Sequence, residues 1–100
     1  MLVCELTTFL ITPSSEALAR HVAFLRQIGD AGLLYMAGKY KDNTGGLRIW
    51  NVSSLDEAKK LAKDDPYSKE GIGRSEFKEW FPAFNYSSKI LTDVAAPNNK

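Results

Sequence analysis

The chain contains one histidine, His21, so any imidazole-based mechanism depends on that residue. Histidine suits proton transfer near neutral pH because its unperturbed pKa is about 6.5. His21 lies three residues after Leu18 and four before Leu25, which places it inside the apolar stripe of a predicted helix. From this position alone it is either a general acid or base, or a core histidine that bonds to a backbone carbonyl.

Three further residues have side chains that could do chemistry. Asp65 precedes Pro66, a pair typical of a helix N-cap with proline at the first helical position. Arg48 lies within a predicted strand, where it could bind an anionic ligand or extend from a sheet edge into solvent. Cys4 has no basic neighbour, which favours a buried apolar residue over a nucleophile.

The composition excludes several classes of protein. One histidine and one cysteine exclude an intramolecular disulfide and a cysteine-rich zinc site, and we expect neither metal nor cofactor. The 13 Lys and Arg against 12 Asp and Glu leave a net charge of +1, which argues against a nucleic-acid partner. No stretch reaches the roughly 20 apolar residues of a membrane span, and residues 1–11 lack the features of a signal peptide. The sequence therefore predicts a cytoplasmic protein.

Hydrophobic periodicity predicts the elements that must position these residues. The predicted strands cover residues 2–11, 33–40, 47–52 and 76–84, and the predicted helices cover 16–28 and 55–65. Ser14 or Ser15 is the expected N-cap of the first helix, with Gly29 and Gly32 as candidate stops, and Ser54 with Glu57 forms a capping box for the second.

Glycines and a proline suggest local irregularities in this pattern. Gly38 inside a strand suggests a bulge or a close approach by a ligand or another backbone. Gly45 and Gly46 are assigned to a hairpin turn, and Pro82 marks the last strand as an edge strand or a bulged one.

The order β-α-β-β-α-β predicts an α+β fold of the ferredoxin-like type, an antiparallel sheet with both helices on one face. Aromatic residues occur in both phases of the strands, and two helices cannot cover both faces of the sheet. We therefore expect a homodimer in which two sheets pack face to face. Residues 1–86 form the predicted domain, and 87–100 form a partly mobile C-terminal extension.

The chain also resembles the YciI-like (YCII-related) family of dimeric α+β barrel proteins over residues 2–86. The resemblance rests on RHVAFL (20–25), GDAGLLYMAG (29–38), GGLRIW (45–50), SLDEA (54–58), DPY (65–67), GI (71–72) and EWFP (79–82). Members are similar in fold to muconolactone isomerase, and a few relatives are dehydrochlorinases of hydroxylated aromatics. The resemblance implies an acid–base pair at His21 and Asp65. The family often has Gly-Pro where this chain has Gly38-Lys39.

We therefore expect a pocket between the first helix and the sheet, with His21 as proton shuttle and Asp65 orienting its ring. The predicted reaction is proton abstraction with elimination or isomerisation on a small, cyclic, oxygenated molecule, with Gly38, Arg48 and Tyr67 contacting the substrate. Two alternatives stay open. One is a non-catalytic small-molecule-binding or accessory protein. The other is a monooxygenase of the dimeric α+β barrel group, either cofactor-free or with haem on His21.

Overall fold

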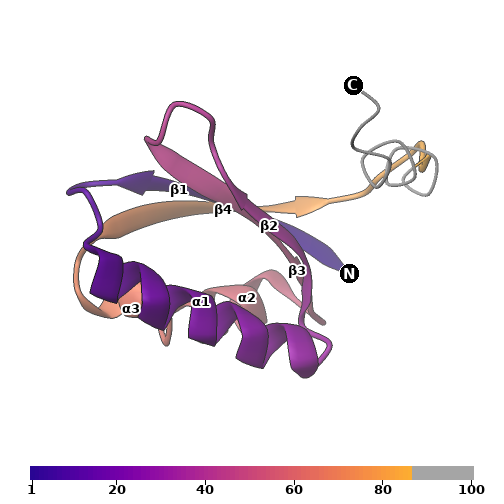
Figure 1. The fold of residues 1–100 in the computed structure, drawn as a ribbon. Helices are drawn as coiled ribbons and strands as arrows, with labels where there is room; N and C mark the ends of the chain where they lie inside the picture. The colour runs from indigo at the N-terminus through magenta and orange to yellow at the C-terminus, as the bar shows by residue number, and fades with distance from the viewer. Residues whose placement is uncertain (87–100) are drawn as a thin grey trace, which may run out of the picture.

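The computed structural model describes residues 1–86, so the predicted extension over 87–100 lies outside the described residues. The elements are β1 (Leu2–Phe9), α1 (Ser15–Asp30), β2 (Leu34–Lys39), β3 (Gly45–Asn51), α2 (Leu55–Ala62), α3 (Pro66–Lys69) and β4 (Gly73–Trp80). The four strands form one antiparallel sheet in the order β2-β3-β1-β4. All three helices lie against one face of it (Figure 1). The predicted α+β, ferredoxin-like fold is confirmed, with α3 as an additional single turn.

The core lies between the helices and the inner face of the two central strands. Val3 of β1 and Trp50 of β3 are directly opposite each other and fully buried. Phe24, Leu25 and Ile28 of α1 pack against this cluster from the helical layer. Because side chains of a strand alternate between its two faces, burying Val3 also turns Glu5 and Thr7 toward the helices.

The helix ends follow local capping chemistry. The hydroxyl of Ser14 accepts a hydrogen bond from the Ala17 amide at 3.1 Å, which begins α1. The helix continues through Gly29 and ends before Gly32, whose φ of +80° suits a residue without a side chain. Of the two candidate stops, Gly29 was therefore wrong. Helix α2 ends at Ala62, before the predicted residue 65, because Asp65 caps α3.

All four strands differ from their predicted ranges, by up to four residues at an end. Strand β4 ends at Trp80, so Pro82 follows the strand, although β4 is an edge strand as expected. The register irregularity of β2 lies between Leu34 and Met36, and the bulge predicted at Gly38 is absent.

Gly45 and Gly46 open β3 and do not form the turn. A side chain on Gly45 would overlap the backbone carbonyl of Thr7, and one on Gly46 would lie 2.6 Å from the carbonyl oxygen of Gly38. These two glycines therefore allow β3 to approach its neighbours on both sides. Within residues 1–86, no helix is long and apolar enough to cross a membrane.

Candidate functional site

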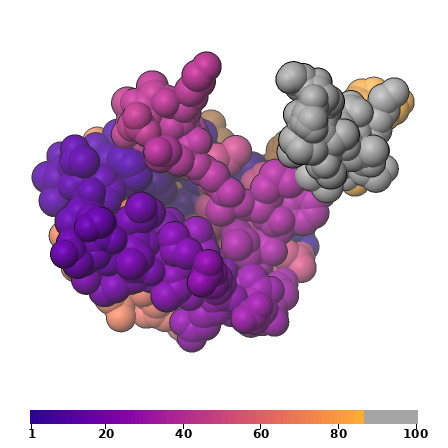
Figure 2. Space-filling model, viewed as in Figure 1, coloured from indigo at the N-terminus to yellow at the C-terminus, as the bar shows by residue number. Residues whose placement is uncertain are grey.

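A cavity of about 470 Å³ lies between the sheet and the helical layer. In Figure 2 it is the recess between α1 and the β2–β3 hairpin. Its walls are largely apolar, and polar side chains reach it from every strand and helix, including the cations Lys39, Lys59, Lys63 and Arg74. The residues discussed below that line it are Glu5, Thr7, Phe9, His21, Gly38, Arg48, Asp65, Tyr67 and Ser75.

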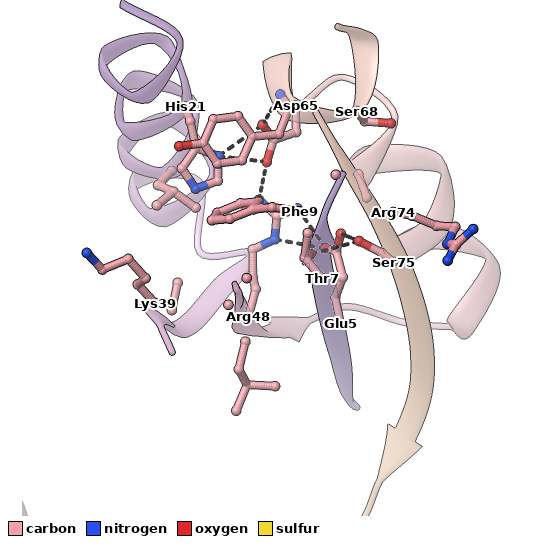
Figure 3. A pocket seen from close by; sticks show the side chains of 18 of the residues that line it. Glu5, Thr7, Phe9, His21, Lys39, Arg48, Asp65, Ser68, Arg74 and Ser75 are labelled. Atoms are coloured by element: carbon pink, nitrogen blue, oxygen red, sulfur yellow. Dashed lines mark hydrogen bonds and ion pairs between the residues drawn. The ribbon is translucent and has the colours of Figure 1, made fainter. Parts of the chain in front are cut away.

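His21 and Asp65 meet at the wall of this cavity (Figure 3). Nδ1 of His21 lies 3.0 Å from each carboxylate oxygen of Asp65. A carboxylate accepts hydrogen bonds, so Nδ1 carries the proton and donates it. His21 Nε2 makes no hydrogen bond to another residue within 1–86. The His21 ring also stacks on Tyr67, with the ring centroids 4.0 Å apart and the planes 2° from parallel. The imidazole is thus held on one edge and one face.

Asp65 has a structural role as well as its contact with the histidine. Its Oδ1 accepts the Tyr67 amide at 2.9 Å as the N-cap of α3, with Pro66 at the first helical position. Its side chain is 3% exposed, and burial alone would raise its pKa. Hydrogen bonds from His21 and the Tyr67 amide, together with the charge of Arg48, outweigh burial and lower the pKa of Asp65. Asp65 is therefore an ionised carboxylate at neutral pH.

Arg48 is buried on an interior strand of the sheet. This excludes the interpretation that its side chain extends from a sheet edge into solvent. Its Nη1 donates to Asp65 Oδ2 at 2.8 Å. Its Nε and Nη2 donate to Glu5 Oε1 at 2.9 and 2.7 Å, and the Trp50 indole donates to the same oxygen at 2.8 Å. Two buried carboxylates thus share one guanidinium, and all three nitrogens of that guanidinium are engaged.

The strand register explains how these charges meet. Glu5 and Arg48 are directly opposite each other across β1 and β3, and Thr7 and Ser75 are directly opposite across β1 and β4. Because Glu5 and Thr7 are two residues apart, both face the cavity. Ser75 donates to Glu5 Oε2 at 2.7 Å, and its hydroxyl lies 2.8 Å from that of Thr7. One hydrogen-bonded chain therefore runs from His21 to Thr7 (Figure 3).

All five residues predicted for the site line this one cavity: Gly38, Arg48, Tyr67, His21 and Asp65. Glu5, Thr7 and Ser75 were missed. A signal for Glu5 was present, since it is an acidic residue in an otherwise apolar predicted strand and therefore requires a buried donor. Arg48 is the charged residue of the neighbouring predicted strand. Thr7 and Ser75 had no comparable signal, because isolated hydroxyl residues are common in strands.

The other chemistry-bearing residues lie outside this arrangement. Burial raises the pKa of the Cys4 thiol, which agrees with its interpretation as an inert apolar residue. Among the described residues, no group of three His, Cys, Asp or Glu side chains is placed to hold a metal ion.

Known proteins show the same fold and sequence pattern. A family model described as the YCII-related domain matches residues 1–80. The uncharacterized protein YjpA of Bacillus subtilis (strain 168) is 33% identical over 67 residues, which cover 67% of this chain and 79% of that protein. The solved structure of 5-chloro-2-hydroxyhydroquinone dehydrochlorinase (TftG) from Burkholderia phenoliruptrix AC1100, in complex with 2,5-dihydroxybenzoquinone, superposes with a TM-score of 0.61. That match has 21% identity and covers 81% of this chain and 94% of the other. The chain thus belongs to the YCII-related domain family.

Proposed function

We propose that this protein is a small-molecule enzyme in which His21 removes a proton from a cyclic, oxygenated substrate bound in the cavity. One observation carries the proposal: Asp65 holds His21 Nδ1, while Nε2 has no bond to the rest of the described chain. A carboxylate on Nδ1 favours the tautomer with its proton on Nδ1, which leaves the lone pair of Nε2 to accept a proton, and it orients the ring. Arg48 in turn orients the carboxylate.

The charges of the site support this role. Glu5 and Asp65 carry two negative charges against the single positive charge of Arg48. When Nε2 takes a proton, the imidazolium adds a second positive charge next to Asp65. The buried cluster then becomes neutral, which stabilises the transition state of proton removal. A positioned base of this kind contributes typically ~10²–10⁴-fold to the rate.

The chemistry that follows depends on the substrate. In an elimination, the electron pair left by the proton forms a double bond as a leaving group departs from the neighbouring atom with its own pair. In an isomerisation, His21 Nε2 returns the proton to a different carbon. The largely apolar walls, which include the aromatic side chains of Phe9 and Tyr67, suit a ring. The dehydrochlorinase similar in fold makes a chlorinated hydroxyhydroquinone the first substrate to test.

The test measures chloride release from 5-chloro-2-hydroxyhydroquinone by wild type, His21→Gln and Asp65→Asn. Asparagine also caps helices well, so Asp65→Asn removes the charge while retaining a cap for α3. We expect His21→Gln to lose at least about 10²-fold in rate and Asp65→Asn to lose less. Circular dichroism must show that both variants fold.

Two results would count against the proposed function. Equal rates of chloride release by wild type and His21→Gln would rule out His21 as the catalytic base. Saturable binding of 2,5-dihydroxybenzoquinone with no turnover of the chlorinated compound would favour a binding module. Nitrogen NMR of the single imidazole supplies a second readout, because it distinguishes the expected Nδ1-protonated tautomer from the Nε2-protonated one.

We also propose that a second copy of the chain covers the open face of the sheet. That face carries apolar side chains on all four strands: Met36, Leu47 and Trp80 are exposed, and Leu2, Cys4 and Leu6 are half-buried. Exposed apolar patches of this kind mark interfaces. Light scattering should give twice the chain mass for wild type. It should give the monomer mass for Met36→Glu, with Lys60→Glu on the helical side as control. A monomeric wild type would contradict the dimer.

A further inference from the structure

The hydrogen-bonded chain that holds Arg48 ends at a second polar group in the cavity, the hydroxyl of Thr7. Glu5 is 4% exposed, and Ser75 and Thr7 are half-buried. Opposite Thr7 on β3 stands Gly46, which places no side chain beside the hydroxyl. Both Thr7 and Gly46 line the cavity, so a bound molecule can reach this hydroxyl.

The direction of the hydrogen bonds in this chain follows from the charge at its start. Glu5 Oε1 accepts from the Arg48 guanidinium and the Trp50 indole, so Glu5 is a carboxylate and only accepts. The single hydroxyl proton of Ser75 is donated to Glu5 Oε2. The contact of 2.8 Å between Thr7 and Ser75 must then use the proton of Thr7. The Thr7 oxygen therefore offers lone pairs to the cavity and has no proton left to donate.

We propose that Thr7, held by Ser75 and Glu5, is a specificity-determining residue that binds a hydroxyl group of the substrate. An acceptor at this wall binds a donor such as a phenol or enol hydroxyl and gives nothing to a ketone or an ether oxygen. The proposal rests on the proposed function in taking this cavity as the substrate site. With His21 Nε2 as the other acceptor, the site takes a ring that carries two hydroxyl donors.

The test compares three ring molecules of similar shape with two, one and no hydroxyl donors: hydroquinone, 4-methoxyphenol and 1,4-dimethoxybenzene. Dissociation constants are measured by NMR titration of the full chain under reducing conditions. Each hydroxyl that meets an acceptor should tighten binding by about 2- to 10-fold, the range of a net hydrogen bond. Wild type should therefore show two steps of increasing affinity along the series.

The variants assign each step to one acceptor. Thr7→Val keeps the shape of the side chain without its oxygen and should leave a single step. Thr8→Val, on the exposed opposite side of β1, should retain both. Ser75→Ala frees the Thr7 proton for the cavity, so 4-methoxyphenol should gain affinity relative to hydroquinone. Ser75→Ala also replaces Thr7→Val as the deciding variant if the latter fails to fold.

Each outcome decides for or against the subsite. Two steps in wild type and one in Thr7→Val support it. A single wild-type step that Thr7→Val abolishes also supports it and counts against His21 as an acceptor. A number of steps unchanged by Thr7→Val overturns the proposal, and so does the absence of saturable binding by all three compounds. If wild type shows one step in affinity that is lost in His21→Leu and retained in Thr7→Val, His21 remains the proposed base and the Thr7 subsite is ruled out.

Discussion

Replacing Arg48 with methionine tests the central structural inference, that one guanidinium neutralises two buried carboxylates. Methionine keeps an apolar side chain at this position but removes three hydrogen bonds of 2.7–2.9 Å to Glu5 and Asp65, together with the guanidinium that lies over the Phe24 and Trp50 rings. Those two side chains are 5% and 3% exposed, so water cannot replace the lost donors. Breaking a buried ion pair from one side costs about 3–5 kcal/mol.

This cost is large compared with the stability of a domain of this size, about 5–15 kcal/mol. The assay is urea unfolding followed by circular dichroism. At a slope of roughly 1.5 kcal/mol per molar urea, the unfolding midpoint should fall by about 2–3 M. Acid protonates an unpaired buried carboxylate and removes its charge. The difference between wild type and Arg48→Met should therefore narrow as the pH falls below about 5.

A matched control is available on the surface. Arg20 makes a two-pronged ion pair with Glu70 at 2.8 and 3.1 Å, but the two side chains are 51% and 40% exposed. Arg20→Met should leave the urea midpoint nearly unchanged, because solvent screens an exposed ion pair. Adding Glu5→Gln to Arg48→Met should restore part of the stability, because one of the two unpaired charges is then gone. If Arg48→Met is no more destabilising than Arg20→Met, the inference about the buried charges is wrong.

Three further predictions concern single sites. The folded pKa of Asp65 lies below its unfolded value of about 3.9, so its ionised form stabilises the fold above about pH 4, and this contribution is lost as the pH falls through the folded pKa. Thermal melting between pH 7 and pH 3 should consequently show a steeper loss of Tm for wild type than for Asp65→Asn; parallel curves would refute this. Gly45→Ala should cost at least about 1–3 kcal/mol because its methyl group would overlap the Thr7 carbonyl, whereas Gly38→Ala has open space and should cost less than Gly45→Ala in the same urea assay. Cys4 should react with an aromatic disulfide reagent more slowly than a free thiol at pH 8 and at the free-thiol rate in denaturant, because burial raises its pKa; rapid reaction in the folded state would contradict this.

Local signals account for most of the predicted fold. Ser14, Ser54 and the Asp65-Pro66 pair begin the helices because short-range hydrogen bonds satisfy the free amides of a first turn. The alternation of apolar residues fixes which face of β3 carries Trp50. Strand ends were less predictable, as at Gly73 and Pro82, because they depend on where a neighbouring strand stops pairing.

The candidate site was likewise predictable from the sequence only in part. Helical periodicity placed His21 on the inner face of α1, and the family resemblance paired it with Asp65, 44 residues away in the sequence. The sequence signalled that Glu5 needs a buried donor, but it could not assign the contacts among Glu5, Arg48 and Ser75, because these depend on the register of β1 against β3 and β4. A shift of one residue in either pairing would turn these side chains to the opposite face. Local patterns thus specify which elements form and which faces they bury. Which charges share the interior depends on strand register, and register is set by packing the whole sheet.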